Sequence, residues 1–130
     1  MIKFLPAPKV KSRIEHIVRK LNWDYIDTDK IICFESRGTK SSRVHARCWS
    51  LPRVWQQALN IMPHYVVEII GERYDELDQE RRDKLLIHEL LHIPKTFSGA
   101  LRPHKGYIST SIVNKLYKEL MSTEELSWIP

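Results

Sequence analysis

The chain has 130 residues, 42% of them hydrophobic, and carries a formal net charge of +5. This length accommodates one domain with a single core but not two. No apolar stretch is long enough to cross a membrane, and Pro6 and Pro8 interrupt the start MIKFLPAPKV, so we expect no signal peptide. We therefore expect one cytoplasmic domain over residues 1–130, with no membrane partner, and the oligomeric state is left open.

The first half of the chain predicts a helix followed by a β-hairpin. Apolar residues recur with helical spacing at Val10, Ile14, Ile17, Val18 and Leu21. Ser12 and Glu15 form a capping box at the start of this helix or lie just inside it. The β-rich runs KIICFES and RVHARCWS lie on either side of the polar connection SRGTKSS, a pattern that favours a hairpin.

The middle of the chain predicts a short helix, a strand and then a second, apolar helix. Pro52 suits the first turn of the short helix, and the chain then turns into the strand YVVEII at residues 65–70. Asp75 or Asp78 is expected to cap the helix that contains residues 85–93. Because the back of this helix is wholly apolar, it should pack into the core.

The last segment predicts a closing amphipathic helix that begins after Ser109 or Thr110. Its apolar positions are Ile112, Val113, Leu116, Tyr117, Leu120 and Met121. The predicted order of elements is αββαβαα. This order favours an α+β fold in which a small antiparallel or mixed sheet packs on the central apolar helix.

A metal-binding pattern lies on that central helix, in the run LLIHELLHIPKTFSGALRPHKGY at residues 85–107. His88, Glu89 and His92 form the motif H-E-x-x-H. On a helix, side chains four residues apart lie on one face, so two imidazoles at this spacing share one Zn²⁺ while the adjacent carboxylate reaches a water on the metal. The alternative, histidines that only form hydrogen bonds in the core, leaves this spacing unexplained.

A catalytic zinc requires a third protein ligand and an open fourth position. The candidates are His104, Glu119, Glu124, Glu125 and the upstream histidines. We favour His104 because Pro94 ends the helix, and the turn residues around Gly99 allow the following loop to fold back over the motif. The metzincin pattern is excluded, because it requires glycine and histidine where this chain has Lys95 and Ser98. An acidic ligand from the last helix, Glu119 above all, remains the alternative.

The run LLIHELLHIPKTFSGALRPHKG, with ARCWSLPRVWQQALNIMPHYVVEIIGERYDEL upstream, resembles the metallopeptidases of archaeal and phage type, a zincin-like family. The resemblance covers residues 31–120. It implies His88, His92 and His104 as metal ligands and Glu89 as the catalytic residue. The chain is also similar to SprT-like proteases, whose third histidine likewise follows in a downstream loop. The resemblance implies a peptidase but identifies no substrate.

Hydrolysis of a peptide bond requires a general base and a donor to the oxyanion in addition to the metal ligands. Glu89 is the expected general base, and Tyr107 or Arg102 is a candidate donor to the oxyanion that develops on the substrate carbonyl. In the zincin arrangement the strand at residues 65–70 would lie along the cleft. An exposed edge there would bind a peptide or protein substrate as an added strand, with Tyr65, Val67 and Ile69 as the candidate substrate-binding residues.

The two cysteines, Cys33 and Cys48, lack metal-binding spacing. In a hairpin centred near residues 40 and 41 they would face each other and could form a cross-strand disulfide. Two free, half-buried thiols are the favoured interpretation, because an intracellular compartment is reducing.

The charge distribution supports a second hypothesis. Residues 1–53 hold 12 Lys or Arg against 5 Asp or Glu, whereas residues 54–130 hold 9 against 11. A basic first helix and hairpin could bind nucleic acid, with zinc in a purely structural role. The cations concerned are Lys9, Lys11, Arg13, Arg19, Lys20, Arg37, Lys40, Arg43, Arg47 and Arg53. A structural site normally has four protein ligands and does not need Glu89, so we favour the enzyme.

Overall fold

The computed structural model describes residues 1–39 and 43–127, which form an α+β fold around a mixed four-stranded sheet. The strands are β1 (Lys3–Pro6), β2 (Ile31–Arg37), β3 (Ala46–Ser50) and β4 (Tyr65–Ile70). The helices are α1 (Pro8–Lys20), the 3₁₀ turn η1 (Thr28–Lys30), α2 (Arg53–Leu59), α3 (Gly71–Asp75), α4 (Gln79–Leu90) and α5 (Thr110–Ser127). None of the described helices is long and apolar enough to cross a bilayer.

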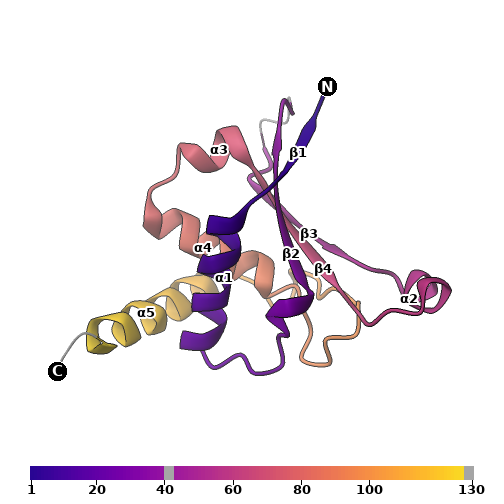
Figure 1. Cartoon of the computed structure of the whole chain (residues 1–130). Coiled ribbons are helices and arrows are strands. Elements are labelled where there is room, and N and C mark those ends of the chain that lie inside the picture. Colours follow the sequence, from indigo (N-terminus) through magenta and orange to yellow (C-terminus); the bar gives the residue numbers. More distant parts are fainter. Residues whose placement is uncertain (40–42, 128–130) are drawn as a thin grey trace.

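The sheet has the strand order β1-β2-β4-β3. β2 pairs with β4 in parallel, and β1 and β3 are the antiparallel outer strands. Figure 1 shows α1, α4 and α5 gathered on one side of this sheet, with α2 standing apart at the far end of β3 and β4. The core lies between the sheet and these three helices, where apolar side chains of β4, α1 and α4 are fully buried.

The predicted hairpin is wrong, because β4 lies between β2 and β3. The physical reason is the apolar character of β4 on both of its faces. A strand of this kind is best buried in the middle of a sheet, whereas β3, with its mixed polar sequence ARCWS, tolerates an edge. The seven predicted elements are present in the predicted order, and the structure adds β1, the 3₁₀ turn η1 and the short helix α3.

The strand order also decides whether Cys33 and Cys48 form a disulfide or remain free thiols. Cys33 and Cys48 both lie level with Val67 of β4, one on each side of it. Two strand spacings put their backbones roughly 9.5 Å apart. A disulfide requires Cα atoms closer than about 7 Å, so the cross-strand bridge is excluded. Both thiols are free, as the favoured interpretation predicted.

Two of the helix caps predicted from the sequence are present in the structure, and one is not. Asp78 caps α4 by accepting a 2.9 Å hydrogen bond from the Arg81 backbone, and the Ser109 hydroxyl accepts from the backbone N–H of Ile112 at the start of α5. The capping box on α1 is absent: this helix begins at Pro8, and Ser12 lies inside it. Proline suits the first helical position because its missing N–H has no partner there in any case.

Candidate metal centre

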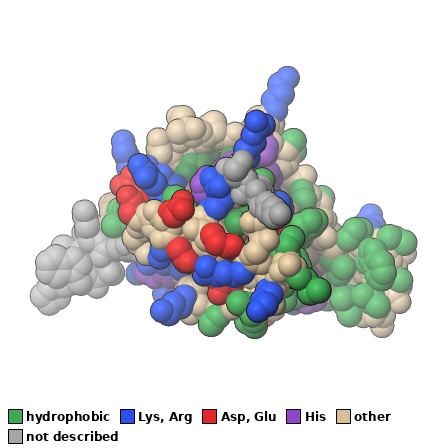
Figure 2. Space-filling view, turned by 90° about the horizontal axis from the view of Figure 1, so that it is seen from above, with side chains coloured by type: hydrophobic (Ala, Val, Ile, Leu, Met, Phe, Trp, Pro, Cys, Tyr) green, Lys and Arg blue, Asp and Glu red, His purple; other side chains and the backbone are tan. Residues whose placement is uncertain are grey.

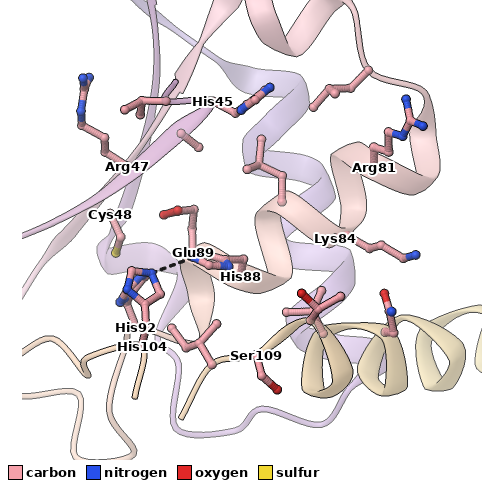
Figure 3. A pocket seen from close by; sticks show the side chains of 18 of the residues that line it. His45, Arg47, Cys48, Arg81, Lys84, His88, Glu89, His92, His104 and Ser109 are labelled. Carbon is pink, nitrogen blue, oxygen red and sulfur yellow. Dashed lines mark hydrogen bonds between the residues drawn. The ribbon is translucent and has the colours of Figure 1, made fainter. Parts of the chain in front are cut away.

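Three imidazoles converge at the end of α4. Their candidate ligand atoms all lie within 4.8 Å of one another, which makes His88, His92 and His104 a group able to hold a metal ion. The ring of His104 has its centroid 5.1 Å from that of His88 and 4.7 Å from that of His92. Figure 3 shows the three side chains together, with Glu89 directly beside them. The structure therefore brings together the three ligands that the sequence predicted.

The spacing of the ring nitrogens fits one small cation. The Nε2 atoms of His88 and His104 are 3.1 Å apart. Two nitrogens bound to one tetrahedral Zn²⁺ at about 2.0–2.1 Å would be roughly 3.3 Å apart. His92 is held for the same role, because its Nδ1–H donates to the Arg102 carbonyl at 2.8 Å and leaves Nε2 free to coordinate. The donor set and its geometry thus fit a zinc ion.

The helix supplies two of these ligands in slightly different ways. His88 lies in the regular part of α4, which ends at Leu90. His92 lies in a tighter final turn, where its backbone N–H donates to the Glu89 carbonyl at 3.1 Å. Burial lowers the pKa of His88, and the neighbouring imidazoles of His92 and His104 lower it further. A lowered pKa favours the neutral imidazole, which is the form that binds a metal.

Glu89 is the buried carboxylate of the site. Its side chain is 5% exposed, and burial raises its pKa to about 7. It is adjacent to the first histidine but does not belong to the group that could hold the ion. In Figure 3 its carboxylate points across the cavity toward β3. A carboxyl group that titrates near neutral pH is suited both to accept and to release a proton.

The loop that carries His104 is fixed by the core residue Tyr65. The Tyr65 hydroxyl accepts a hydrogen bond from the Gly99 N–H and donates one to the Ala100 carbonyl, both at 2.8 Å. Its ring packs edge-on against Phe97, with centroids 5.0 Å apart. Gly99 has a φ of +93°, and a Cβ added there would clash with Gln56 and come within 2.7 Å of the Leu51 carbonyl. Glycine is therefore required at this turn.

A cavity of about 930 Å³ lies beside the histidines, between α4, residues 43–48 and the start of α5. Glu89, Cys48 and the three histidines form one part of its lining. His45, one of the upstream histidines set aside in favour of His104, also lines the cavity, although it lies outside the group able to hold a metal ion. Burial raises the pKa of Cys48 to about 12, and the charge of Glu89 adds to this effect.

Other predicted site residues lie elsewhere. Tyr107 and Arg102 are not among the described residues that line the cavity; instead the Arg102 guanidinium lies 5.2 Å from the Tyr107 ring centroid. Glu119 is exposed on α5, outside the histidine group. The side chains of Glu124 and Glu125 lie outside the described residues. His16 and His64 belong neither to the cavity lining nor to the metal group in the described part of the chain.

The predicted peptide-binding strand requires a correction. β4 is paired on both sides, so it has no free edge to which a peptide could add. Its residues Tyr65, Val67 and Ile69 are buried in the core, at 1%, 0% and 3% exposure. The prediction of an exposed edge at residues 65–70 is therefore wrong. The strand with a free edge on this side of the sheet is β3, which also lines the cavity.

Three histidines around an open cavity, with a buried glutamate beside the first of them, are typical of a metal-dependent hydrolase. A family model described as "Putative phage metallopeptidase" matches residues 2–126. The chain belongs to this metallopeptidase family, as the sequence resemblance predicted, and the family implies a metal cofactor. No curated protein and no solved structure matched the chain.

Proposed function

We propose that the protein is a zinc-dependent peptidase of zincin-like arrangement, in which Glu89 is the general base. One observation carries the proposal: the metal-competent group contains three imidazoles, and the adjacent buried carboxylate stands outside it. Three ligands leave a coordination position for water or substrate, whereas structural zinc sites normally use four protein ligands. The position of Glu89 is explained by a water-activating site and not by a structural one.

The chain's own residues then have distinct tasks. When bound, zinc supplies Lewis acidity toward the substrate carbonyl and lowers the pKa of a coordinated water to about 7. The carboxylate of Glu89 accepts a proton from the attacking water and then donates it to the leaving nitrogen of the substrate. His92 keeps its orientation through the 2.8 Å hydrogen bond from Nδ1 to the Arg102 carbonyl.

The substrate peptide is proposed to lie along β3. This strand is an outer strand of the sheet, and residues 43–48 form the wall of the cavity that faces α4. An outer strand presents backbone N–H and C=O groups to which an extended peptide can add by main-chain hydrogen bonds. Cys48 of β3 lines the cavity together with Glu89 and the three histidines. A peptide added to β3 would therefore place its scissile bond over Glu89 and the histidines.

The decisive experiment replaces Glu89 by Gln, which keeps the shape of the side chain and removes the base. We expect unchanged zinc content and a fall in cleavage rate of about 10²–10⁴-fold, the usual contribution of a general base. Glu80→Gln is the matched control, because Glu80 is on the same helix but exposed and paired with Lys84 at 3.0 Å. A Glu89→Gln protein that keeps both zinc and full cleavage would refute the mechanism.

Nucleic-acid binding stays a prediction of the sequence. Several of the cations on which it depended are held by carboxylates: Arg13 donates two 2.8 Å hydrogen bonds to the buried Asp83, Arg37 pairs with Asp75, and Arg47 with Glu68. Lys40 lies outside the described residues. The proposal would require DNA affinity that falls log-linearly with salt and survives Glu89→Gln. Replacement of Arg43 and Arg47 by Ala would test it.

A further inference from the structure

The cavity beside the histidines has an unbalanced charge. Its lining includes the cations Arg43, Arg47, Arg81 and Lys84, whereas Glu89 is the one Asp or Glu among the described residues that line it. Over the whole chain the ratio is 21 Lys or Arg to 16 Asp or Glu. The cavity is therefore enriched in positive charge relative to the protein that surrounds it.

Two of these cations are already neutralised by neighbours. Arg47 pairs with Glu68 at 3.4 Å, and Lys84 pairs with Glu80 at 3.0 Å while its ammonium lies 5.2 Å from the centre of the Tyr117 ring. Arg43 and Arg81 have no ion pair with any residue that the structure describes. One precedes β3 and the other lies in the first turn of α4, so each wall of the cavity offers one such arginine.

The position of Arg81 relative to the metal centre follows from helix geometry. Arg81, Leu85, His88 and His92 all line the cavity from α4 and its final turn, at the spacing of one helical face. Seven residues separate Arg81 from His88, which corresponds to about 10 Å along the helix. An extended peptide spans that distance with about three residues. Figure 3 shows Arg81 far along α4 from the histidines and Glu89.

We propose that the cavity recognises a carboxylate about three residues from the bond that is cleaved, with Arg81 as the main donor and Arg43 as the second. The carboxylate comes either from an Asp or Glu side chain or from the carboxyl terminus of the substrate. Arginine suits this task because its planar guanidinium donates two parallel hydrogen bonds to a carboxylate. This inference rests on the proposed peptidase activity and names the substrate class of that site.

The test compares peptides that differ only by Glu or Gln at each position around the cleaved bond, each with a free or an amidated carboxyl terminus. We expect kcat/KM to favour Glu about tenfold at one position roughly three residues from that bond, as a charge-assisted hydrogen bond would give. A preference for the free terminus instead would identify the terminal carboxylate as the source. Arg81→Glu should reverse the preference toward a Lys peptide, whereas Arg53→Glu, outside the cavity lining, should not.

Binding measurements keep this test separate from the proposed function. The same peptides are titrated into the Glu89→Gln protein loaded with zinc, so that a preference for the carboxylate can be measured without cleavage. Equal affinity for Glu and Gln peptides at every position and for both termini, or a preference that Arg81→Glu leaves unchanged, would overturn carboxylate recognition. If the zinc-loaded wild-type protein cleaves none of these peptides while the binding preference for the carboxylate is present, the peptidase is overturned and carboxylate recognition is retained.

A second, independent observation concerns the apolar surface around α2. The exposed side chains are Trp49, Val54, Trp55, Leu59, Ile61 and Met62, and we call this set the α2 patch. Val54 is 71% exposed and Trp55 is 55% exposed. In Figure 2 the projection on the right-hand side of the molecule is dominated by hydrophobic side chains. Contiguous exposed apolar surface of this kind marks an interaction site.

The α2 patch continues onto the side of the sheet that faces away from the helices. Ile32, Val66 and Trp49 lie level with one another across β2, β4 and β3, and alternation along the strands puts them on the face opposite the core. Ile32 and Trp49 are exposed. The apolar surface on this face extends as far as the ion pair between Arg47 and Glu68.

We infer that the α2 patch docks onto a second copy of this chain. If each of its six side chains contributes on the order of 100 Å², given the 150–250 Å² that a buried aromatic residue covers, two copies bury about 1,200 Å², the lower limit for a specific interface. The segment 51–64 contains Arg53 as its only Lys, Arg, Asp or Glu residue. A surface that is apolar apart from this one cation can pack against its own copy, which a two-fold symmetric contact requires.

Analytical ultracentrifugation over a range of concentrations tests this inference. The zinc-loaded protein should sediment as a dimer at high concentration, and Trp55→Glu or Leu59→Glu should make it monomeric. Ile112→Glu is the matched control, because Ile112 is an exposed apolar residue on α5, away from the patch. Circular dichroism verifies that each variant is folded. A wild-type protein that is monomeric throughout, or patch variants that dimerise like wild type, would overturn the inference.

Discussion

The helix α4 and the loop from Pro94 to Ser109 build the same candidate metal centre by different means. His88 and His92 are brought together by the helical repeat, over four residues of sequence. His104 is brought to them by tertiary hydrogen bonds, from Tyr65 to Gly99 and Ala100 and between His92 and Arg102. The helix therefore provides a preformed pair, and the core provides the third ligand. We therefore expect substitutions of residues that hold the loop to weaken metal binding even when those residues are not ligands. Substitutions at the distant end of α4 should leave metal binding unchanged.

The largest effect is expected from removing a ligand on either side. His88→Ala and His104→Ala should each lower zinc affinity by more than about 100-fold, since even second-shell changes cost about 10–100-fold. Competition with a chelator measures this. Retention of zinc by His104→Ala, together with its loss in Glu119→Ala, would contradict the three-histidine site and remove the loop from the comparison.

Burial of Glu89 on the helix lowers the stability of the folded protein when its carboxylate is ionised, whereas the loop has no such residue. Its pKa is raised from 4.5 to about 7 in the folded, metal-free protein. Below pH 4.5 the carboxyl is protonated whether folded or unfolded, and the cost is absent. Above pH 7 it is ionised in both states and the full cost remains, on the order of 3 kcal/mol. Metal-free Glu89→Gln should therefore be more stable than wild type at pH 8 and nearly equal to it at pH 4.

Urea unfolding at these two pH values measures the difference. A stability gain of the same size at both pH values would show that burial of the ionised carboxylate is not its cause. The Glu80→Gln protein is again the control, because Glu80 is exposed and its replacement should change stability little at either pH.

A smaller effect should reach the metal through the loop. Tyr65→Phe removes the hydroxyl that binds Gly99 and Ala100 but keeps the ring against Phe97. We expect a loss of stability of about 1–3 kcal/mol, because two backbone groups lose their partner, and a fall in zinc affinity of about tenfold. Tyr107→Phe is the control, since Tyr107 is exposed. Unchanged zinc affinity in Tyr65→Phe would show that the loop holds His104 without this anchor.

The smallest effect should come from the opposite end of α4. Asp78→Ala removes the cap that accepts from the Arg81 backbone at 2.9 Å. Such a change costs about 1 kcal/mol of stability. Zinc affinity should stay within about twofold of wild type, because the ligand pair lies at the other end of the helix. A large loss of zinc on this substitution would mean that the helix pair is not preformed.

The sequence predicted the parts of the molecule that depend on local spacing. The buried faces of α1 and α4, the Asp78 and Ser109 caps, and the pairing of His88 with His92 all follow from the helical repeat or from side-chain bonds within one turn. The face predicted for α5 is confirmed at Val113 and Leu120, whereas Ile112 is exposed. His104 was correctly placed beside them, because Pro94 and Gly99 require the chain to turn after the helix. The family followed from the same residues.

The strand order was decided only by tertiary structure. Strand pairing joins residues far apart in the chain, so the runs on either side of SRGTKSS could not reveal that β4 would separate β2 from β3. That one exchange removes the disulfide between Cys33 and Cys48, leaves residues 65–70 without a free edge, and gives the free edge to β3. The part of the cavity lining formed by residues 43–48, which includes His45, depends on it as well. The buried face of a helix can be predicted from the spacing of its own residues, because the helical repeat is local. Which strand lies beside another depends on how the whole sheet buries its apolar side chains, and these come from distant parts of the chain.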